Sequence, residues 1–278
     1  MKYTEYDDKT LKHLQNTELM ILKDFIEICE DNNLDYYIYG GSLIGAIRHK
    51  GFIPWDDDLD VIMFREDYDK FKKIFNESYN DKYYLLCKET EEDYFYLFSK
   101  LVLKGTIFEE EWVNQVNFNL GINIDIFVLD DLSDNKIKRY IQLKKAFFYS
   151  KIIIMSKIKV PNLSFIPRTI TNIIQLFLKL FNIKPADIQK RYSKFIMKYH
   201  NPDAKDVFDV SVTVEEYPQI FNKKGFKPIQ KAQFEDIMVN IPNNYDEILT
   251  SIYGDYMKLP PKEDRYNHIT RQIDFGKY

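Results

Sequence analysis

The chain has 278 residues, of which 45% are hydrophobic and 29% are charged, and this composition excludes an intrinsically disordered protein. The 39 Lys and Arg residues nearly balance the 43 Asp and Glu residues, and the net charge of −4 argues against a nucleic-acid partner. Cys29 and Cys87 are the only cysteines, which excludes a disulfide scaffold and zinc sites of the Cys₄ or Cys₂His₂ type and favours the cytoplasm.

The first 133 residues predict a small mixed sheet flanked by helices. Apolar residues recur every three or four positions from Thr10 to Glu30, and this spacing predicts an amphipathic helix. Aromatic and branched runs between turn residues predict strands. The expected elements that follow are strand 36–39, helix 43–50, strand 59–63, helix 67–76, and strands 83–87, 94–102 and 123–128.

Basic charge is concentrated in the second half of the chain. Residues 136–200 contain fifteen Lys or Arg and one acid, Asp187, so this segment carries +14 and the remainder carries −18. We expect an α+β protein with a catalytic core over 1–133, a basic, apolar helical annex over 134–200, and a C-terminal segment over 201–278 that returns to the core. Within the C-terminal segment a helix is expected at the centre of 242–256.

The annex has two possible interpretations, because apolar residues are interleaved with its basic ones. No charge-free apolar run reaches about 20 residues, so no membrane-spanning helix is expected. In one interpretation the apolar stripe packs on the core and the charges face solvent. In the other, the stripe and its basic face contact an anionic membrane. We favour the second, with the protein peripheral on the inner face of the plasma membrane.

Four carboxylates lie within five residues, at Asp56, Asp57, Asp58 and Asp60. If a strand begins at Asp58, side-chain alternation places Asp58 and Asp60 on one face, with Cα atoms about 6.5–7 Å apart. Two hard oxygen ligands at this spacing suit a shared Mg²⁺ or Mn²⁺ ion. The alternative is an exposed acidic turn.

A glycine-rich turn precedes the acids. Gly40, Gly41 and Ser42 follow a predicted strand and open a predicted helix, a context in which backbone N–H groups bind phosphate. A phosphate cradle followed by paired acids predicts a metal-bridged phosphoryl or nucleotidyl site. Arg48 and His49 lie between the two and could neutralise phosphate charge.

A third carboxylate is expected on a neighbouring strand, where it would bind a second metal ion and accept the proton of an acceptor hydroxyl. Asp125 is the candidate, because it lies between branched apolar residues in the strand NIDIFV. Asp130 and Asp131 follow it and are interpreted as ordinary turn acids.

These segments resemble the LicD family. Residues 39–71, YGGSLIGAIRHKGFIPWDDDLDVIMFREDYDKF, are similar to the family's signature, and LFSKLVLKGT is similar to its strand with a lysine, here Lys100. GINIDIFVLD resembles the strand of the third acid. Val128 stands where proline is common, and this departure is expected to alter a turn without removing a functional group. The C-terminal PNNYDEILTSIYGDYMKLPPKEDRYNH resembles a further family motif, which ends here at His268.

The resemblance implies a nucleotidyltransferase-like fold and a phosphotransferase. Asp58, Asp60 and Asp125 would bind metal, and Lys100 and His268 would belong to the substrate site. The expected reaction moves a phospho-alcohol, with phosphocholine favoured, from a CDP-activated donor such as CDP-choline and releases CMP. The acceptor is expected to be a hydroxyl of a glycan or lipid-linked glycan, in a lipopolysaccharide or teichoic-acid precursor. A choline cation would need an aromatic partner, and Trp55 beside the acids is the candidate.

Two other functions remain open. A nucleotidyltransferase that moves NMP from an NTP onto a small hydroxyl compound would use the same glycines and acids. A non-catalytic membrane scaffold would use the basic annex alone, but four crowded carboxylates are costly when no cation binds them.

Overall fold

The computed structural model describes residues 6–110, 120–157, 165–211, 219–265, 267, 268 and 270–278. In chain order the elements are α1 (Asp8–Asp31), β1 (Tyr37–Ile38), α2 (Gly40–Ile44), the π-helical turn η1 (Gly45–His49), β2 (Asp60–Phe64), α3 (Arg65–Ser78), β3 (Tyr83–Leu86), β4 (Ser99–Leu103), β5 (Ile107–Glu110), β6 (Asn123–Leu132), α4 (Lys136–Lys157), α5 (Phe165–Leu180), α6 (Pro185–Ile196), the 3₁₀ turn η3 (Met197–Tyr199), β7 (Asp206–Asp209), β8 (Gln219–Asn222), η4 (Lys223–Phe226), β9 (Gln230–Phe234), β10 (Ile237–Ile241), α7 (Tyr245–Tyr253), η5 (Lys262–Asp264) and β11 (Thr270–Asp274).

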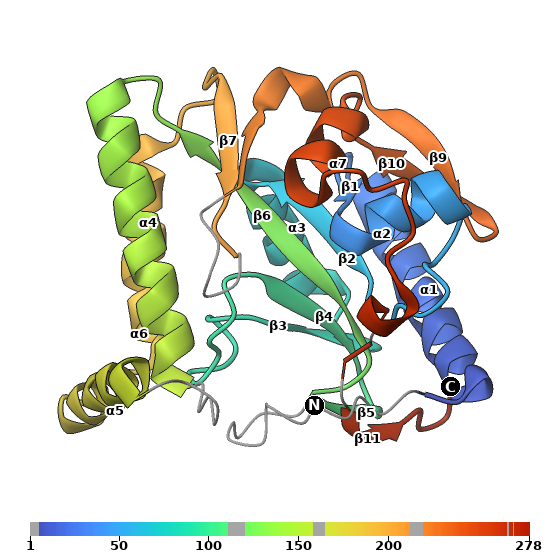
Figure 1. Cartoon of the computed structure of the whole chain (residues 1–278), viewed down its shortest axis with the longest axis horizontal. Helices are drawn as coiled ribbons and strands as arrows, with labels where there is room; N and C mark the ends of the chain where they lie inside the picture. Colours follow the sequence, from blue (N-terminus) through green and yellow to red (C-terminus); the bar gives the residue numbers. More distant parts are fainter. Residues whose placement is uncertain (1–5, 111–119, 158–164, 212–218, 266, 269) are drawn as a thin grey trace.

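A mixed sheet runs through the middle of the molecule, with β6 at its centre (Figure 1). Within the described residues it has seven strands. β2 pairs with β6 in parallel, and β4 pairs antiparallel with the first half of β6. β7 pairs antiparallel with the last three residues of β6, so the long β6 joins two parts of the sheet. The expected mixed α+β class is confirmed.

The helices α1 and α3 pack against one face of this sheet. Asp7 caps α1 by accepting the N–H of Thr10, and the buried stripe of α1 includes Phe25. Phe25 shares one buried cluster with Phe71 of α3, Val61 of β2 and Ile126 of β6. Because side chains alternate along a strand, the neighbours of Val61 and Ile126 point to the opposite face.

The helices α4, α5 and α6 stand together at one side of the sheet, at the left in Figure 1. Pro185 begins α6, and Pro167 lies in the first turn of α5, where a missing N–H is tolerated. Among the described residues, no helix combines the length and apolar character that a bilayer crossing requires.

The last part of the chain adds further strands that the sequence did not indicate. β8 extends β7 at the edge of the sheet, β9 and β10 form a hairpin, and β11 pairs with β5. α7 occupies the centre of the segment 242–256, where a helix was expected.

Two expectations for β6 were wrong. The strand extends to Leu132, so Asp130 and Asp131 are buried strand residues and not turn acids. The Arg65 guanidinium binds Asp130 through two hydrogen bonds of 2.7 and 3.0 Å, and Lys223 binds Asp131 at 2.7 Å. Val128 pairs with Met63 inside the strand, so its replacement of a proline alters no turn.

Candidate active site

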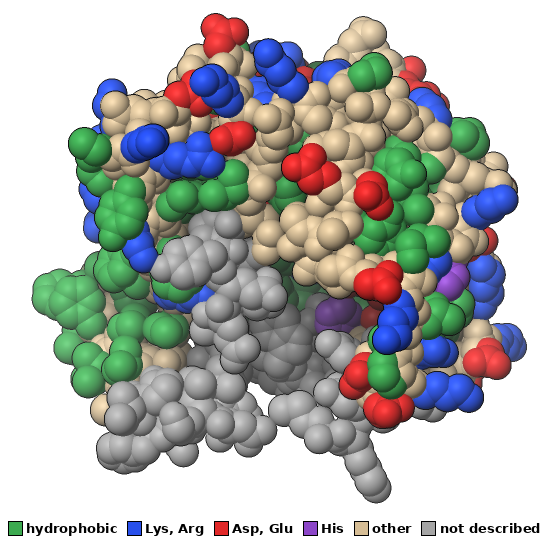
Figure 2. Space-filling model, turned by 45° about the horizontal axis from the view of Figure 1, so that its top comes forward, with side chains coloured by type: hydrophobic (Ala, Val, Ile, Leu, Met, Phe, Trp, Pro, Cys, Tyr) green, Lys and Arg blue, Asp and Glu red, His purple; other side chains and the backbone are tan. Residues whose placement is uncertain are grey.

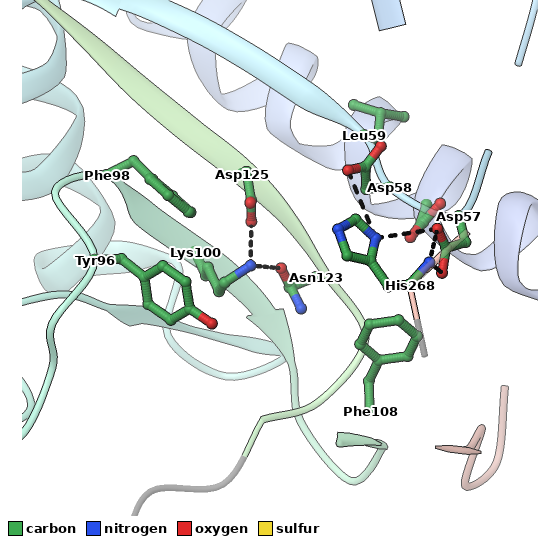
Figure 3. A pocket seen from close by; sticks show the side chains of 11 residues that line it. Asp57, Asp58, Leu59, Tyr96, Phe98, Lys100, Phe108, Asn123, Asp125 and His268 are labelled. Atoms are coloured by element: carbon green, nitrogen blue, oxygen red, sulfur yellow. Dashed lines mark hydrogen bonds and ion pairs between the residues drawn. The ribbon is translucent and has the colours of Figure 1, made fainter. Parts of the chain in front are cut away.

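Three predicted site residues lie side by side on adjacent strands. Asp60 of β2 is paired with Asp125 of β6, and Asp125 is paired with Lys100 of β4. Directly paired residues project from the same face of a sheet. The Lys100 ammonium lies 2.7 Å from Asp125 Oδ1 and 3.2 Å from Asn123 Oδ1 (Figure 3). The order across the sheet is therefore Asp60, Asp125 and Lys100, so that Asp125 lies between a second acid and a buried cation.

A cavity opens at this end of the sheet. Asp58, Lys100, Asp125 and His268 all line it, which brings together four of the predicted site residues. Its other lining residues are Glu18, Asp57, Leu59, Tyr96, Phe98, Phe108 and Asn123. Asp60 is not among them; its Oδ2 atom lies beside Gly40 at the start of α2.

Asp57 fixes the C-terminal segment over the cavity. The backbone N–H of His268 lies 3.0 Å from both carboxylate oxygens of Asp57, and its Nδ1 lies 3.1 Å from Asp57 Oδ1. The same Nδ1 is 3.9 Å from Asp58 Oδ2 (Figure 3). Asp57 was not predicted to be a site residue, although it lies within the acidic run that carries Asp58.

Glu18 is a further acid of the cavity, and it was not predicted from the sequence. This α1 residue is 2% exposed, lines the cavity, and has an Oε2 atom without a hydrogen-bond partner among the described residues. Burial, followed by the charges of Asp58 and Asp57, raises the pKa of Glu18 well above its usual value. The signal was present in the sequence: Glu18 lies four residues from Leu14 and from Leu22, on the buried stripe of α1.

The predicted metal ligands repel one another electrostatically. Burial is the main cause that raises the pKa of Asp60 well above its usual value, and the charges of Asp58 and Asp125 add to it. Burial also raises the pKa of Asp58, while the opposite charges of His268 and Lys100 reduce this effect. Asp56 shows the same direction, with burial and Asp58 as its leading causes. A group of acids with raised pKa values gains free energy when a cation binds.

The glycines allow the acids to approach the start of α2. Gly40 has a φ of +55°, and a Cβ atom on it would lie 2.6 Å from Asp60 Oδ2. A Cβ atom on Gly41 would lie 3.1 Å from Asp56 Oδ2. The Ser42 hydroxyl accepts the N–H of Asp60 at 2.9 Å, so this side chain holds β2 in place. The helix begins at Gly40, three residues earlier than expected.

Arg48, His49 and Trp55 do not line the cavity. Arg48 donates from Nε to His49 Nε2 at 2.9 Å and from Nη1 to the carbonyl oxygen of Tyr256. The Arg265 guanidinium lies 4.6 Å from the centre of the Trp55 ring, so this ring already faces a cation. These side chains anchor the segment that leads to His268.

The aromatic side chains on the cavity wall come instead from the segment before β4. Tyr96 and Phe98 have ring centres 5.0 Å apart, and the Lys100 ammonium lies 5.2 and 5.3 Å from those centres. Residues 96, 98 and 100 follow the alternation of an extended chain. That alternation in YFYLFSK was the available signal for this wall.

The donor set of the site suits a hard divalent cation, although it is not drawn together as a finished metal centre. Asp58, Asp60 and Asp125 offer carboxylate oxygens, the ligands that Mg²⁺ and Mn²⁺ prefer. In the part of the chain that the structure describes, no three Asp, Glu, His or Cys side chains converge closely enough to hold an ion as they stand. The fit therefore rests on ligand chemistry and on the raised pKa values of Asp58 and Asp60.

Comparison with known proteins places the chain in a family. Residues 33–154 match the family described as "LicD/FKTN/FKRP, nucleotidyltransferase domain". The chain is 31% identical over 271 residues to the lipopolysaccharide cholinephosphotransferase LicD of Haemophilus influenzae, which covers 93% of this chain and 96% of that protein. The chain therefore belongs to the LicD family.

Two shorter similarities agree with this assignment. An uncharacterised protein of Rickettsia typhi is 33% identical over 107 residues, which is 34% of this chain and 35% of that protein. The human ribitol 5-phosphate transferase FKRP is 43% identical over 42 residues, which is 15% of this chain and 8% of that protein.

Proposed function

We propose that this protein is a metal-dependent phosphotransferase that moves phosphocholine from CDP-choline to a hydroxyl of a lipopolysaccharide or related cell-surface glycan precursor at the cytoplasmic face of the membrane, releasing CMP. The observation that carries this proposal is the row of Asp60, Asp125 and Lys100 across three neighbouring strands, beside a cavity that also holds Asp58 and His268. The name of the Haemophilus influenzae relative supports choline phosphate as the transferred group and lipopolysaccharide as the acceptor.

The reaction needs a base for the acceptor hydroxyl. In the proposed step the acceptor oxygen bonds to the phosphorus of the phosphocholine group, the bond from that phosphorus to the oxygen of CMP breaks, and the acceptor proton passes to Asp125. The Lys100 ammonium, 2.7 Å from Asp125 Oδ1, orients this carboxylate. Lys100 is also a buried cation on the cavity wall, where it would neutralise negative charge on the phosphates of a donor.

Asp58, Asp60 and Asp125 would hold the divalent ion, Mg²⁺ or Mn²⁺, which when bound neutralises negative charge on the donor phosphates. The nucleotidyltransferase-like fold is part of the same proposal and is supported by the family description. The backbone N–H groups at the start of α2, at Gly40 and Gly41, are the proposed phosphate contacts, with Arg48 and His49 further out.

The alternative is a nucleotidyltransferase that moves NMP from an NTP onto a small hydroxyl compound. The family description favours it, because it names a nucleotidyltransferase domain. The two reactions differ in which side of the pyrophosphate is transferred, so their products separate them.

The test is to incubate the full chain and Mg²⁺ with CDP-choline, other CDP-alcohols and the four NTPs, in the presence of deacylated lipopolysaccharide. Release of CMP from CDP-choline with labelled acceptor is the expected result. Release of pyrophosphate from an NTP would establish the alternative, and no turnover with any donor would favour a scaffold. Asp125→Asn should lower the turnover rate far more than the affinity for the donor.

A further inference from the structure

The helix α5 presents an apolar face to solvent. Its outer residues are large, hydrophobic and about half to three-quarters exposed; they are Ile170, Ile173, Leu176, Phe177, Leu180 and, just beyond the helix, Phe181. The spacing of three and four residues places them on one side of the helix. Figure 2 shows hydrophobic side chains gathered over α5 at the lower left of the molecule.

The opposite side of α5 is already packed. Leu178 is 9% exposed and shares a buried cluster with Ile153 of α4, Ile188 of α6 and Phe95, while Ile174 packs against the edge of this cluster. Gln175 donates to the carbonyl oxygen of Met155 at 3.0 Å, which ties α5 to α4. The exposed stripe is therefore a second apolar face that remains after the helix has been folded onto its neighbours.

The helical segment that carries this face is strongly basic. Residues 136–200 carry +14, and in the described helices exposed basic side chains occur on every element: Lys136, Lys138, Lys144 and Lys145 on α4, Lys179 on α5, and Lys190, Arg191 and Lys194 on α6. In Figure 2, Lys and Arg side chains lie above the hydrophobic ones on the same side of the molecule. A basic surface beside an apolar face complements an anionic lipid surface, whereas a second copy of the same face would bring like charges together.

We propose that α5 lies flat in the interface of an anionic lipid bilayer, with Ile173, Phe177 and Leu180 inserted among the acyl chains and the lysines of α4 and α6 on the lipid head groups. At 16 residues α5 would lie along the interface, and it does not meet the requirements for crossing a bilayer. This inference concerns where the protein acts and does not depend on the chemistry of its cavity.

The same helices hold one wall of the cavity. Gln189 of α6 donates a hydrogen bond to the carbonyl oxygen of Tyr94 at 2.6 Å. The backbone N–H of Ala186 donates to the carbonyl oxygen of Glu92 at 3.2 Å. The segment fixed in this way continues into Tyr96 and Phe98, which line the cavity. If the proposed function holds, a bilayer bound to α5 brings a lipid-linked acceptor close to the reacting groups.

Vesicle flotation tests the proposal with the full chain. Vesicles of phosphatidylcholine alone are compared with equimolar phosphatidylcholine and phosphatidylglycerol, at low salt and at about 0.5 M salt. We expect binding to the anionic vesicles only, and weaker binding at high salt. Ile173→Ser with Phe177→Ser should lower the partition coefficient about tenfold or more. The control, Ile220→Ser with Met238→Ser, changes exposed apolar residues on β8 and β10 and should bind as the unmodified chain does.

The outcomes distinguish membrane binding by α5 from the absence of membrane binding and from contact with a second copy of the chain. Equal recovery with both kinds of vesicle, or equal binding by the two double variants, would overturn it. A concentration-dependent dimer without lipid, lost only in the α5 variant, would show that α5 contacts a second copy instead. Circular dichroism shows whether the variants keep their helices. Turnover of a water-soluble acceptor should be unchanged in the α5 variant, so a failed vesicle experiment and a failed activity assay have different meanings.

Discussion

At the scale of single residues, the sequence predicted the acids better than their partners. Asp125 lies in a strand whose alternation can be read directly, whereas Asp58 lies two residues before β2 and not in the strand as the sequence suggested. The structure nevertheless places both acids in one cavity. Asp57 could not be matched with its partner, because His268 is 211 residues away. Lys100 was assigned by resemblance alone, since no local pattern reveals that β4 lies beside β6.

Removal of either proposed metal ligand should abolish transfer. Asp58→Asn and Asp60→Asn each keep the side-chain shape but lose a negative ligand, whose charge stabilisation amounts to several kcal/mol at the transition state. Because about 1.36 kcal/mol corresponds to a tenfold change in rate, we expect a loss on the order of a thousandfold or more in turnover. Asp203→Asn, at an exposed loop position, is the matched control. Turnover within about threefold of the unmodified chain at saturating Mg²⁺ would remove the residue concerned from the metal site.

Glu18 should make the metal-free protein less stable as the pH rises. Its pKa is raised in the folded state, so above about pH 4.3, where the unfolded chain loses this proton, folding requires proton uptake. The stability of the unmodified chain should therefore fall by up to about 1.36 kcal/mol per pH unit from this group alone until the folded pKa is reached. The Gln side chain of Glu18→Gln stays neutral at every pH, so this variant should lose less stability than the unmodified chain as the pH rises.

Urea unfolding in the presence of a chelator, at several pH values between about 4 and 8, measures this difference. The free energies of unfolding of the two proteins should be most similar at the acidic end and should diverge in favour of Glu18→Gln as the pH rises. Parallel curves for the two proteins would show that Glu18 is ionised in the folded chain. Glu77→Gln, an exposed change on α3, should run parallel to the unmodified chain.

At the scale of elements, local patterns predicted the helices and most of the first strands. The strong apolar spacing of α1 and α3 does not depend on their neighbours, and both helices lie close to the predicted ranges. β6 was predicted too short because its last residues include two acids, which resemble a turn until Arg65 and Lys223 are placed beside them. β7 and β11 pair with strands far away in the sequence and carry little local signal.

The contact between β6 and the start of α3 offers a test of this explanation. The Asp130 side chain is 3% exposed and the Arg65 side chain 13%, so Arg65→Met leaves a buried carboxylate unpaired and should cost about 3–5 kcal/mol of stability. The double change Arg65→Met with Asp130→Leu removes both charges and should recover most of that loss. Urea unfolding of the unmodified chain and the two variants measures the loss and the recovery of stability. A cost below about 1 kcal/mol for Arg65→Met would mean that the pair contributes little to holding β6 in place.

At the scale of the whole molecule, charge and chemistry are divided between two regions. The acids and the cavity lie at one end of the sheet. The annex 134–200 supplies the excess of basic charge and the exposed apolar face. The sequence could predict this division, since charge counts do not depend on folding. It could not decide whether the apolar stripe packs inward, because α5 does both: Leu178 is buried while Phe177 and Leu180 remain exposed. The boundaries at 133 and 200 stay predictions.

The acid cluster should also make the stability of the whole chain depend on Mg²⁺. An ion that binds only the folded state at about one hundred times its dissociation constant adds about 2.7 kcal/mol, which corresponds to a rise of about 5–10 °C in the melting temperature of a chain of this size. Because the pKa values of Asp56, Asp58 and Asp60 are raised in the folded chain, protons compete with the ion for these oxygens as the pH falls. The rise should therefore be larger at about pH 8 than at about pH 5. Differential scanning fluorimetry with and without Mg²⁺ at both pH values measures it, with Asp60→Asn expected to abolish the rise and Asp203→Asn to retain it. The same rise at both pH values, or its persistence in Asp60→Asn, would place the ion at another part of the protein.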